Sequence, residues 1–280
     1  MNHKLNNILL SKISNLLKNS SLIKYYLRFL TKLGEIRLIR IFRNKILNLL
    51  SINWNWWRIS LLSKNSVEFH FLDYVIDKIK KPKVILDLGS GRAMQSIEFS
   101  IIFPNANIFA FECDPQALKI CKQNVVFLKN IEIIPKAVYN EDKFIKFYPV
   151  INEKGTSSLF KINRLFKEII GDYLQEEIEV EAVRINTWAK QRKISKIDIC
   201  WLDLQGAEYE ALEGLGDLIY SVQALYVEVE QKAIYKGQRL IKDVFEFLNS
   251  KGFSMVKYHP TKPGWWGNAI FLNNKLLIET

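Results

Sequence analysis

The chain has 280 residues, 49% of them hydrophobic and 25% charged, and its formal net charge at pH 7 is +11. This composition excludes disordered and fibrous proteins and suits one large α/β domain, alone or with an extension. The sequence contains no run of about 18 apolar residues, so we expect no membrane span, and we expect no secretory signal. Its three cysteines show no spacing typical of a metal site, which favours a reducing, cytoplasmic compartment over a disulfide scaffold.

Residues 1–60 carry most of the positive charge, because they hold eleven lysines and arginines against one acid, Glu35. Apolar residues recur at helical spacing through residues 1–50, which predicts amphipathic helices. We therefore expect a basic helical extension, residues 1–65, before a second domain, residues 66–280. The extension is either a cap or dimerisation element whose basic side is solvated, or a surface that lies on anionic lipid at the inner face of a membrane or grips an anionic substrate.

A strand, a glycine turn and a helix follow a helix predicted for residues 66–80. The apolar run Val84–Leu88 predicts a strand buried on both faces, residues 89–91 (Gly-Ser-Gly) a turn, and Gln95–Phe103 a helix. Glycines let backbone N–H groups approach a ligand closely, and the start of a helix attracts an anionic group. A tight connection that binds nothing explains the same pattern. A dinucleotide fingerprint would need a third glycine, where this chain has Met94.

The second predicted strand, Asn107–Glu112, ends in a carboxylate 23 residues after Gly89. A carboxylate at this strand tip can accept hydrogen bonds from both hydroxyls of an adenosine ribose. Pro115 suits the first turn of the next predicted helix, Gln116–Leu128. A ribose acid without the third glycine favours S-adenosylmethionine over NAD as the ligand.

The middle of the chain predicts mainly extended structure. The expected elements are a third strand at Ile131–Val138, an alternating strand at Lys143–Val150, extended pieces at Thr156–Leu159 and Ile178–Ile185, and a short helix at Arg164–Ile170.

Alternating strands and helices return in the last third of the chain. A buried strand ends in Asp203 and is followed by a helix that reaches Leu215. Such alternation, closed by an antiparallel pair, predicts a seven-stranded, mostly parallel sheet with helices on both faces. The remaining elements are strands at Ile197–Leu204, Val222–Glu230, Ser254–His259 and Ala269–Leu272 and a helix at Leu240–Ser250.

With these stretches in view, the chain resembles the FkbM family of S-adenosylmethionine-dependent methyltransferases over about residues 66–273. The Asp-x-Gln-Gly-x-Glu block after the fourth strand is the most specific part of the resemblance. The matching segments are LDLGSGR (86–92), FECDP (111–115), KAV (136–138), TSSL (156–159), WLDLQGAEYEALEGL (201–215), YVEVE (226–230) and WGNAIF (266–271). The resemblance implies a Rossmann-like class I methyltransferase fold.

Three residues depart from the usual pattern of that family. Ala93 stands where members usually carry a third glycine of the first loop. Trp201 and Gln205 stand where many members carry a lysine and a glutamate, which resembles a recurrent variant of the family. A mechanism that uses that lysine or glutamate is therefore not assumed for this chain.

The resemblance also implies how S-adenosylmethionine is bound. The glycine turn is expected to hold the methionine end and Glu112 the ribose, whereas Cys113, Asp114 and the turn after Ala137 are expected to border the adenine. The full set of expected cofactor-binding residues is Asp87, Gly89, Ser90, Gly91, Glu112, Cys113, Asp114, Ala137 and Asp203.

Methyl transfer to a hydroxyl needs a group that takes up the proton. Asp203, at the carboxyl end of the fourth strand, is the first catalytic candidate, as general base, neighbour of the sulfonium or metal ligand; a helix cap is the alternative. Glu230 and His259 are further catalytic candidates, and each also has a structural explanation. Glu228 and Glu230 could join Asp203 around a divalent ion, for which an all-carboxylate set suits Mg²⁺, although solvated strand ends explain these acids equally well.

We therefore expect an O-methyltransferase that acts on a hydroxyl of a sugar, glycolipid, polysaccharide or natural product. Trp265 and Trp266 would form either a floor for a sugar or part of the core. A nucleic-acid methyltransferase that uses the basic extension is disfavoured, because base-amine enzymes carry Asn/Asp-Pro-Pro-aromatic where this chain has residues 203–206 (Asp-Leu-Gln-Gly). A non-catalytic adaptor with the same fold is the third alternative, and a homo-oligomer remains open.

Overall fold

The structure is a computed structural model, and it describes residues 67–79, 81–152, 155–163, 173–261 and 264–278. The helical extension predicted for residues 1–65 and the short helix predicted for Arg164–Ile170 lie outside the described residues. The division of the chain at residues 65 and 66 therefore stays a prediction.

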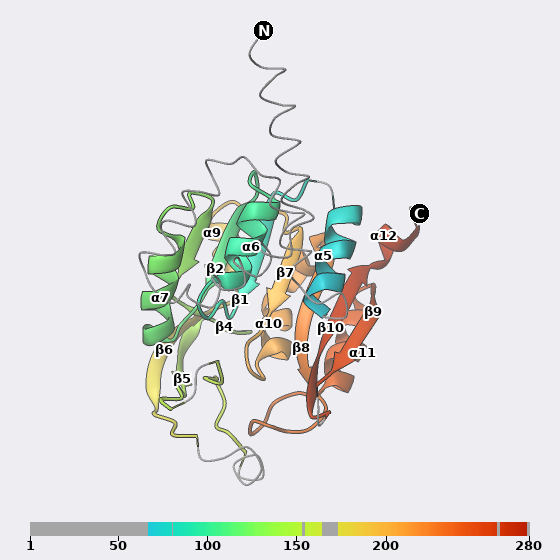
Figure 1. Cartoon of the computed structure of the whole chain (residues 1–280). Coiled ribbons are helices and arrows are strands. Elements are labelled where there is room, and N and C mark those ends of the chain that lie inside the picture. The colour runs from blue at the N-terminus through green and yellow to red at the C-terminus, as the bar shows by residue number, and fades with distance from the viewer. Residues whose placement is uncertain (1–66, 80, 153–154, 164–172, 262–263, 279–280) are drawn as a thin grey trace, which may run out of the picture. The chain divides into compact units, whose positions relative to one another are not determined.

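A seven-stranded sheet forms the centre of the described domain, with the order β3-β2-β1-β7-β8-β10-β9 (Figure 1). The first five strands in this order run parallel, and β10 lies antiparallel between β8 and β9, which confirms the predicted sheet. The strands are β1 (Val84–Leu88), β2 (Asn107–Phe111), β3 (Ile131–Ile134), β7 (Ile199–Leu202), β8 (Ala224–Glu230), β9 (Phe253–Pro260) and β10 (Trp266–Asn273).

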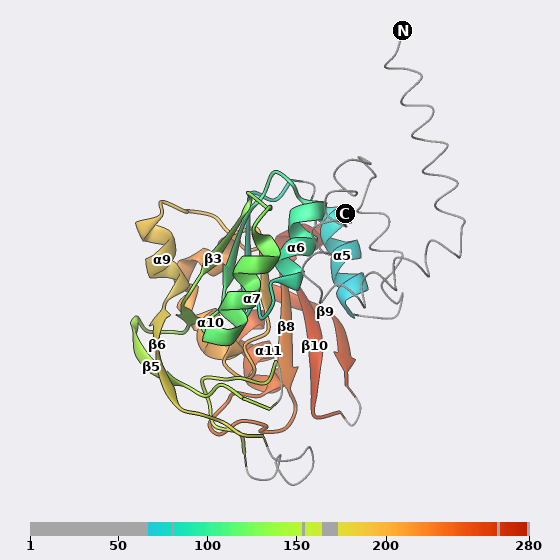
Figure 2. The ribbon, with the colours of Figure 1, turned by 60° about the vertical axis from the view of Figure 1, so that its left-hand side comes forward.

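Helices cover both faces of this sheet, as predicted (Figures 1 and 2). One face carries α5 (Val67–Lys78), α6 (Met94–Ile102) and α7 (Pro115–Val125). The other face carries α9 (Ile185–Gln191), α10 (Glu208–Gly214) and α11 (Ile241–Ser250). A short 3₁₀ helix (Gly216–Ser221) and α12 (Asn274–Ile278) complete the described elements.

The strands β1 and β7 show no alternation of buried and exposed residues, because they bury side chains on both faces of the sheet. Both layers between the sheet and the helices are therefore apolar. Trp201 of β7 is stacked on Tyr226 of β8, with ring centroids 3.4 Å apart, and Phe71 of α5 meets both rings edge-on. On the opposite face, Trp188 of α9 packs edge-on against Phe111 of β2. Trp201 thus belongs to the core, in a place where a lysine would lose its hydration.

A second, three-stranded sheet was not predicted and has the order β4-β6-β5. Its strands are β4 (Ala137–Val138), β5 (Lys143–Phe147) and β6 (Ile178–Val183). The single third strand predicted over Ile131–Val138 is therefore wrong: β3 ends before Pro135, which cannot donate to a ladder, and β4 pairs with β6 instead. The extended piece predicted up to Ile185 is also too long, because α9 begins there.

Among the described residues, no helix combines the length and the apolar character that crossing a lipid bilayer requires.

Candidate functional site

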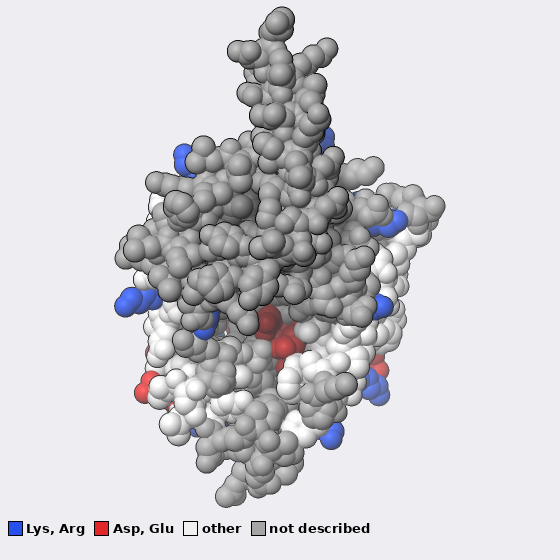
Figure 3. Space-filling view, viewed as in Figure 1, with Lys and Arg blue, Asp and Glu red and all other residues white. Residues whose placement is uncertain are grey.

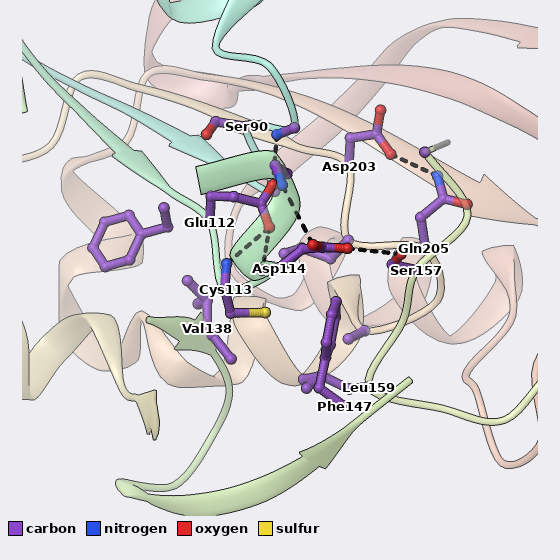
Figure 4. Close-up of a pocket in the computed structure, with 18 of the residues that line it drawn as sticks. Ser90, Glu112, Cys113, Asp114, Val138, Phe147, Ser157, Leu159, Asp203 and Gln205 are labelled. Carbon is purple, nitrogen blue, oxygen red and sulfur yellow. Dashed lines mark hydrogen bonds between the residues drawn. The ribbon is translucent and has the colours of Figure 1, made fainter. Parts of the chain in front are cut away.

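A cavity of about 410 Å³ opens at the carboxyl ends of the central strands (Figure 4). The chain leaves β1 towards β2 on one side, while β7 lies on the other, so this point is the topological switch at which open α/β sheets bind ligands. Glu112, after β2, and Asp203, after β7, both line the cavity. The two carboxylates singled out from the sequence therefore share one site.

The glycine turn after β1 is shaped by close contact with the loop after β7. Gly89 has φ +81°, and a Cβ built on it would lie 1.9 Å from the backbone oxygen of Asp203. Only glycine fits this position. Gly91 has φ +55° and its N–H donates to Oε2 of Glu112 over 2.7 Å. With Ser90, these residues form one wall of the cavity.

Glu112 is held in the cavity wall by the backbone. Its Oε1 accepts from the N–H groups of Cys113 and Asp114, both over 2.8 Å, and its Oε2 accepts from Gly91. Burial raises the pKa of Glu112 to about 7, although these hydrogen bonds oppose the shift. Carboxylate oxygens can each accept more than one bond. The buried Glu112 therefore fits the hydroxyls of a ribose.

Asp114 begins α7 and also reaches across the cavity. Its Oδ1 accepts from the N–H groups of Gln116 and Ala117, so it caps the helix. Its Oδ2 accepts from the hydroxyl of Ser157 over 3.1 Å, which ties the second sheet's connecting loop to α7. Cys113 and Ala137 line the same cavity, and burial raises the pKa of the Cys113 thiol well above its usual value.

Asp87 is not among the residues that line this cavity. Its Oδ2 accepts from the N–H and the hydroxyl of Ser96, over 3.0 and 2.5 Å, in the first turn of α6. Ala93, the N-cap residue of that helix, offers no side-chain cap, so Asp87 supplies one from β1. Burial raises the pKa of Asp87 to about 7. Its place indicates support of the glycine turn; a direct role in cofactor binding stays a prediction.

The loop after β7 arranges Asp203 beside further acids. Gln205 Nε2 donates to Oδ1 of Asp203 over 2.7 Å and to Oε2 of Glu228 over 2.6 Å. Both oxygens of Glu208 accept from the backbone, one from Leu204 N–H and the other from Gly206 N–H. The N-cap residue of α10 is Ala207, which offers no side-chain cap, and Asp203 lies four residues before it in the cavity wall. This leaves Asp203 as a cavity-lining carboxylate.

Glu208, Glu228 and Glu230 offer oxygens that lie within 4.8 Å of one another. Loss of hydration raises the pKa of all three, that of Glu230 to about 8. The charges of Asp203, Glu230 and Glu208 raise the pKa of Glu228 further. Figure 3 shows acidic side chains at a hollow in the middle of one face of the molecule. Two of the three acids predicted to gather, Glu228 and Glu230, therefore lie close together, with Glu208 rather than Asp203 as the third member of the group.

Neither Glu230 nor His259 is among the residues that line the cavity. His259 lies in β9, where it pairs with Asn268 of β10, and two strands, β8 and β10, separate β9 from β7. Trp265 and Trp266 pack against an apolar cluster of Val150, Ile162, Ile234 and Tyr235. The catalytic roles of Glu230 and His259 stay predictions.

Several cavity residues were not singled out from the sequence. They come from the second sheet and its connections: Phe147, Val150, Ser157 and Leu159. The sequence did contain a signal for two of them, because Ser157 and Leu159 belong to the TSSL segment.

Comparisons with known proteins identify methyltransferases as similar to this chain. A family model described as the methyltransferase FkbM domain matches residues 97–255. The 2-O-methyltransferase NoeI of Sinorhizobium fredii (strain NBRC 101917 / NGR234) is 27% identical over 210 residues, which are 72% of this chain and 84% of that protein.

Solved structures of other methyltransferases resemble the chain at lower identity. A precorrin-6y C5,15-methyltransferase from Geobacter metallireducens is 13% identical, with a TM-score of 0.40 over 74% of this chain and 89% of that one. A putative methyltransferase from Streptococcus mutans, in complex with SAH, is 12% identical, with a TM-score of 0.45 over 75% of this chain and 99% of that one.

Proposed function

Because the chain belongs to the FkbM methyltransferase family, we propose that it methylates a hydroxyl group of a sugar, glycolipid, polysaccharide or natural product. The chain is an S-adenosylmethionine-dependent methyltransferase, and the likeness to a 2-O-methyltransferase supports oxygen as the acceptor atom. The observation that carries the proposal is the single cavity that Glu112 and Asp203 share. A cofactor bound in this cavity would meet both the acid that we propose for the ribose and the proposed proton acceptor.

The cavity wall supplies the groups that the cofactor requires. Glu112 would accept from the ribose hydroxyls, and the backbone of Gly89–Gly91 would hold the methionine end. Cys113, Asp114 and Ala137 would border the adenine. When bound, S-adenosylmethionine supplies an electrophilic methyl group on a sulfonium. The protein's main task is then to orient the acceptor oxygen in line with that methyl group.

Asp203 is the proton acceptor in this proposal. A hydroxyl oxygen that gains a methyl group must lose its proton, and a carboxylate at the cavity wall can take it. Gln205 fixes one oxygen of Asp203 from the side, over 2.7 Å. Burial and the neighbouring charge of Asp203 raise the pKa of Glu228.

The test begins with calorimetric titration of the full chain with S-adenosylhomocysteine, followed by a transfer assay with methyl-labelled S-adenosylmethionine. The acceptor panel contains oligosaccharides, glycolipids and ribosomal RNA. We expect labelled product only with the oligosaccharides or glycolipids and none with ribosomal RNA, and a loss of at least about 100-fold in kcat with Asp203→Asn. Label in RNA alone would support the nucleic-acid alternative instead, and no cofactor binding would support the adaptor.

We further propose that the basic extension, residues 1–65, which lies outside the described residues, brings the enzyme to an anionic membrane surface. Eleven lysines and arginines against one acid within residues 1–60 support this proposal. Flotation with vesicles containing phosphatidylglycerol tests it. Binding should fall steeply in 0.5 M salt and be absent with neutral phosphatidylcholine vesicles. Equal binding to both vesicles would contradict it, and a dimer measured by light scattering would favour the dimerisation alternative.

A further inference from the structure

The side-chain amide of Gln205 bridges two carboxylates at the ends of neighbouring strands. Its Nε2 carries two hydrogens, and it donates to Asp203, after β7, over 2.7 Å and to Glu228, in β8, over 2.6 Å. Its Oε1 accepts from the hydroxyl of Tyr235 over 2.8 Å. This set of partners fixes the orientation of the amide, because a flipped amide would turn its oxygen towards two acids.

The backbone around Gln205 is strained and firmly held. Gln205 has φ +54°, a conformation that costs a residue with a side chain about 1–2 kcal/mol. Ser158 donates its hydroxyl to the carbonyl oxygen of Gln205 over 2.7 Å, and Glu208 accepts from the N–H groups on either side of it. Strain of this kind persists where the surroundings enforce it, and it is concentrated at functional sites.

Tyr235 is held just as firmly on the other side of the amide. It is 2% exposed, and its N–H donates to Gln238. A Cβ at Gly206 would lie 2.9 Å from the Tyr235 ring, so the glycine makes room for the tyrosine. The amide of Gln205 is therefore fixed at both ends.

Two carboxylates that converge in a poorly hydrated site need a cation or hydrogen-bond donors between them. The Gln205 nitrogen occupies the position between Asp203 and Glu228, within hydrogen-bonding distance of each. Both oxygens of Glu208 accept from the loop backbone, from the N–H groups of Leu204 and Gly206. Asp203, Glu228 and Glu208 therefore already have protein donors, and the Gln205 nitrogen stands where a divalent ion between Asp203 and Glu228 would lie.

We propose that Gln205 is a positioning residue that takes the place of a divalent cation between Asp203 and Glu228, so that proton removal by Asp203 needs no metal. This inference rests on the proposed role of Asp203 as proton acceptor. Replacing Gln205 by glutamate would remove both donors and add a third carboxylate at the same point. Three converging carboxylates are the oxygen ligands that Mg²⁺ and Mn²⁺ prefer.

The experiment is a titration of the full chain with MnCl₂, followed by electron paramagnetic resonance of free Mn²⁺. We expect no saturable site below about 1 mM in the wild type and an affinity at least about tenfold higher in Gln205→Glu. Gln123→Glu, the same change on an exposed residue of α7, is the matched control and should behave as the wild type. Gln205→Leu, with neither donors nor an added carboxylate, should gain less affinity than Gln205→Glu.

Titration with S-adenosylhomocysteine shows that each variant is folded. A wild-type Mn²⁺ site that disappears in Glu228→Gln would overturn the inference, and so would a folded Gln205→Glu variant with no gain in Mn²⁺ affinity. If Gln205→Glu does not fold, the wild-type titration and its Glu228→Gln counterpart decide the matter alone. None of these results depends on the acceptor, so failure here is distinct from failure of the acceptor panel.

Discussion

The backbone oxygen of Asp203 lies so close to Gly89 that a Cβ on residue 89 would come within 1.9 Å of it. The turn that follows β1 and the loop that follows β7 thus meet directly, and the wall of the cavity depends on that contact. Gly91, two residues on, has an equally unusual φ of +55° but no atom within 4 Å of a Cβ built there.

These two glycines should respond differently to alanine. Gly89→Ala must push the loop after β7 away, so we expect loss of S-adenosylhomocysteine binding and a decrease of roughly 2–4 kcal/mol in the free energy of unfolding. Gly91→Ala carries only the conformational cost of about 1–2 kcal/mol and should keep the site. Calorimetry and urea denaturation measure both effects. Equal losses in the two variants would contradict the role of the Asp203 contact.

Cofactor binding should become tighter as the pH rises through about 7. The pKa of Glu112 is raised to about 7 by burial, and its ionised form is the better acceptor for ribose hydroxyls. We expect S-adenosylhomocysteine to bind about tenfold more weakly at pH 6 than at pH 8. Glu112→Gln should bind more weakly and with no pH dependence in this range. Glu141→Gln, a change on an exposed acid, is the control and should keep the wild-type profile.

Ala93 should be a site at which glycine stabilises the protein. It has φ +58° and is fully buried at the start of α6, so its Cβ strains the turn. Ala93→Gly relieves about 1–2 kcal/mol of strain and loses about 1 kcal/mol to chain entropy. We expect a net gain of up to about 1 kcal/mol, a rise of roughly 2–4 °C in Tm at most, and unchanged cofactor affinity. A lower Tm would show that the methyl group packs usefully.

Asp87 should make the folded protein less stable as the pH rises from about 4 to 7. Its pKa is raised from 3.8 to about 7, so in this range the native state holds a proton that the unfolded state has lost. The free energy of unfolding then falls by up to about 1.4 kcal/mol per pH unit.

Asp87→Asn removes this contribution, because its amide does not titrate and its oxygen can still accept from Ser96. We expect a flatter pH profile in urea denaturation, with the largest gain relative to the wild type near pH 7. Asp142→Asn, on an exposed acid, should leave the slope unchanged. A wild-type slope in Asp87→Asn would show that Asp87 is ionised throughout this range.

Much of the central sheet followed from the sequence because its strands are short apolar runs between clear turns. The second sheet did not, since β4 has only two residues and pairs with β6, more than forty residues later. The helix α9 was missed although Ile185, Trp188 and Ala189 recur at helical spacing. Its first residue was taken instead as the end of an apolar extended run.

The candidate site was predictable where it consists of strand ends. Glu112 and Asp203 could be found because a carboxylate after a parallel strand lies at the binding edge of the sheet. The roles of Gln205 and Ser157 could not, because they depend on partners far away in the chain, Glu228 and Asp114. Asp87 was assigned to the ligand by its place beside the glycine turn, while its side chain turns to Ser96.

The pairing of β1 with β7 has a consequence for folding during synthesis on the ribosome. Leu86 lies opposite Cys200, so one edge of β1 has no neighbour until more than a hundred further residues have been made. At ribosomal speeds this interval is on the order of ten seconds. During this interval the nascent chain carries a strand edge whose backbone N–H and C=O groups are unpaired. Chaperones that cover such edges could act in that time.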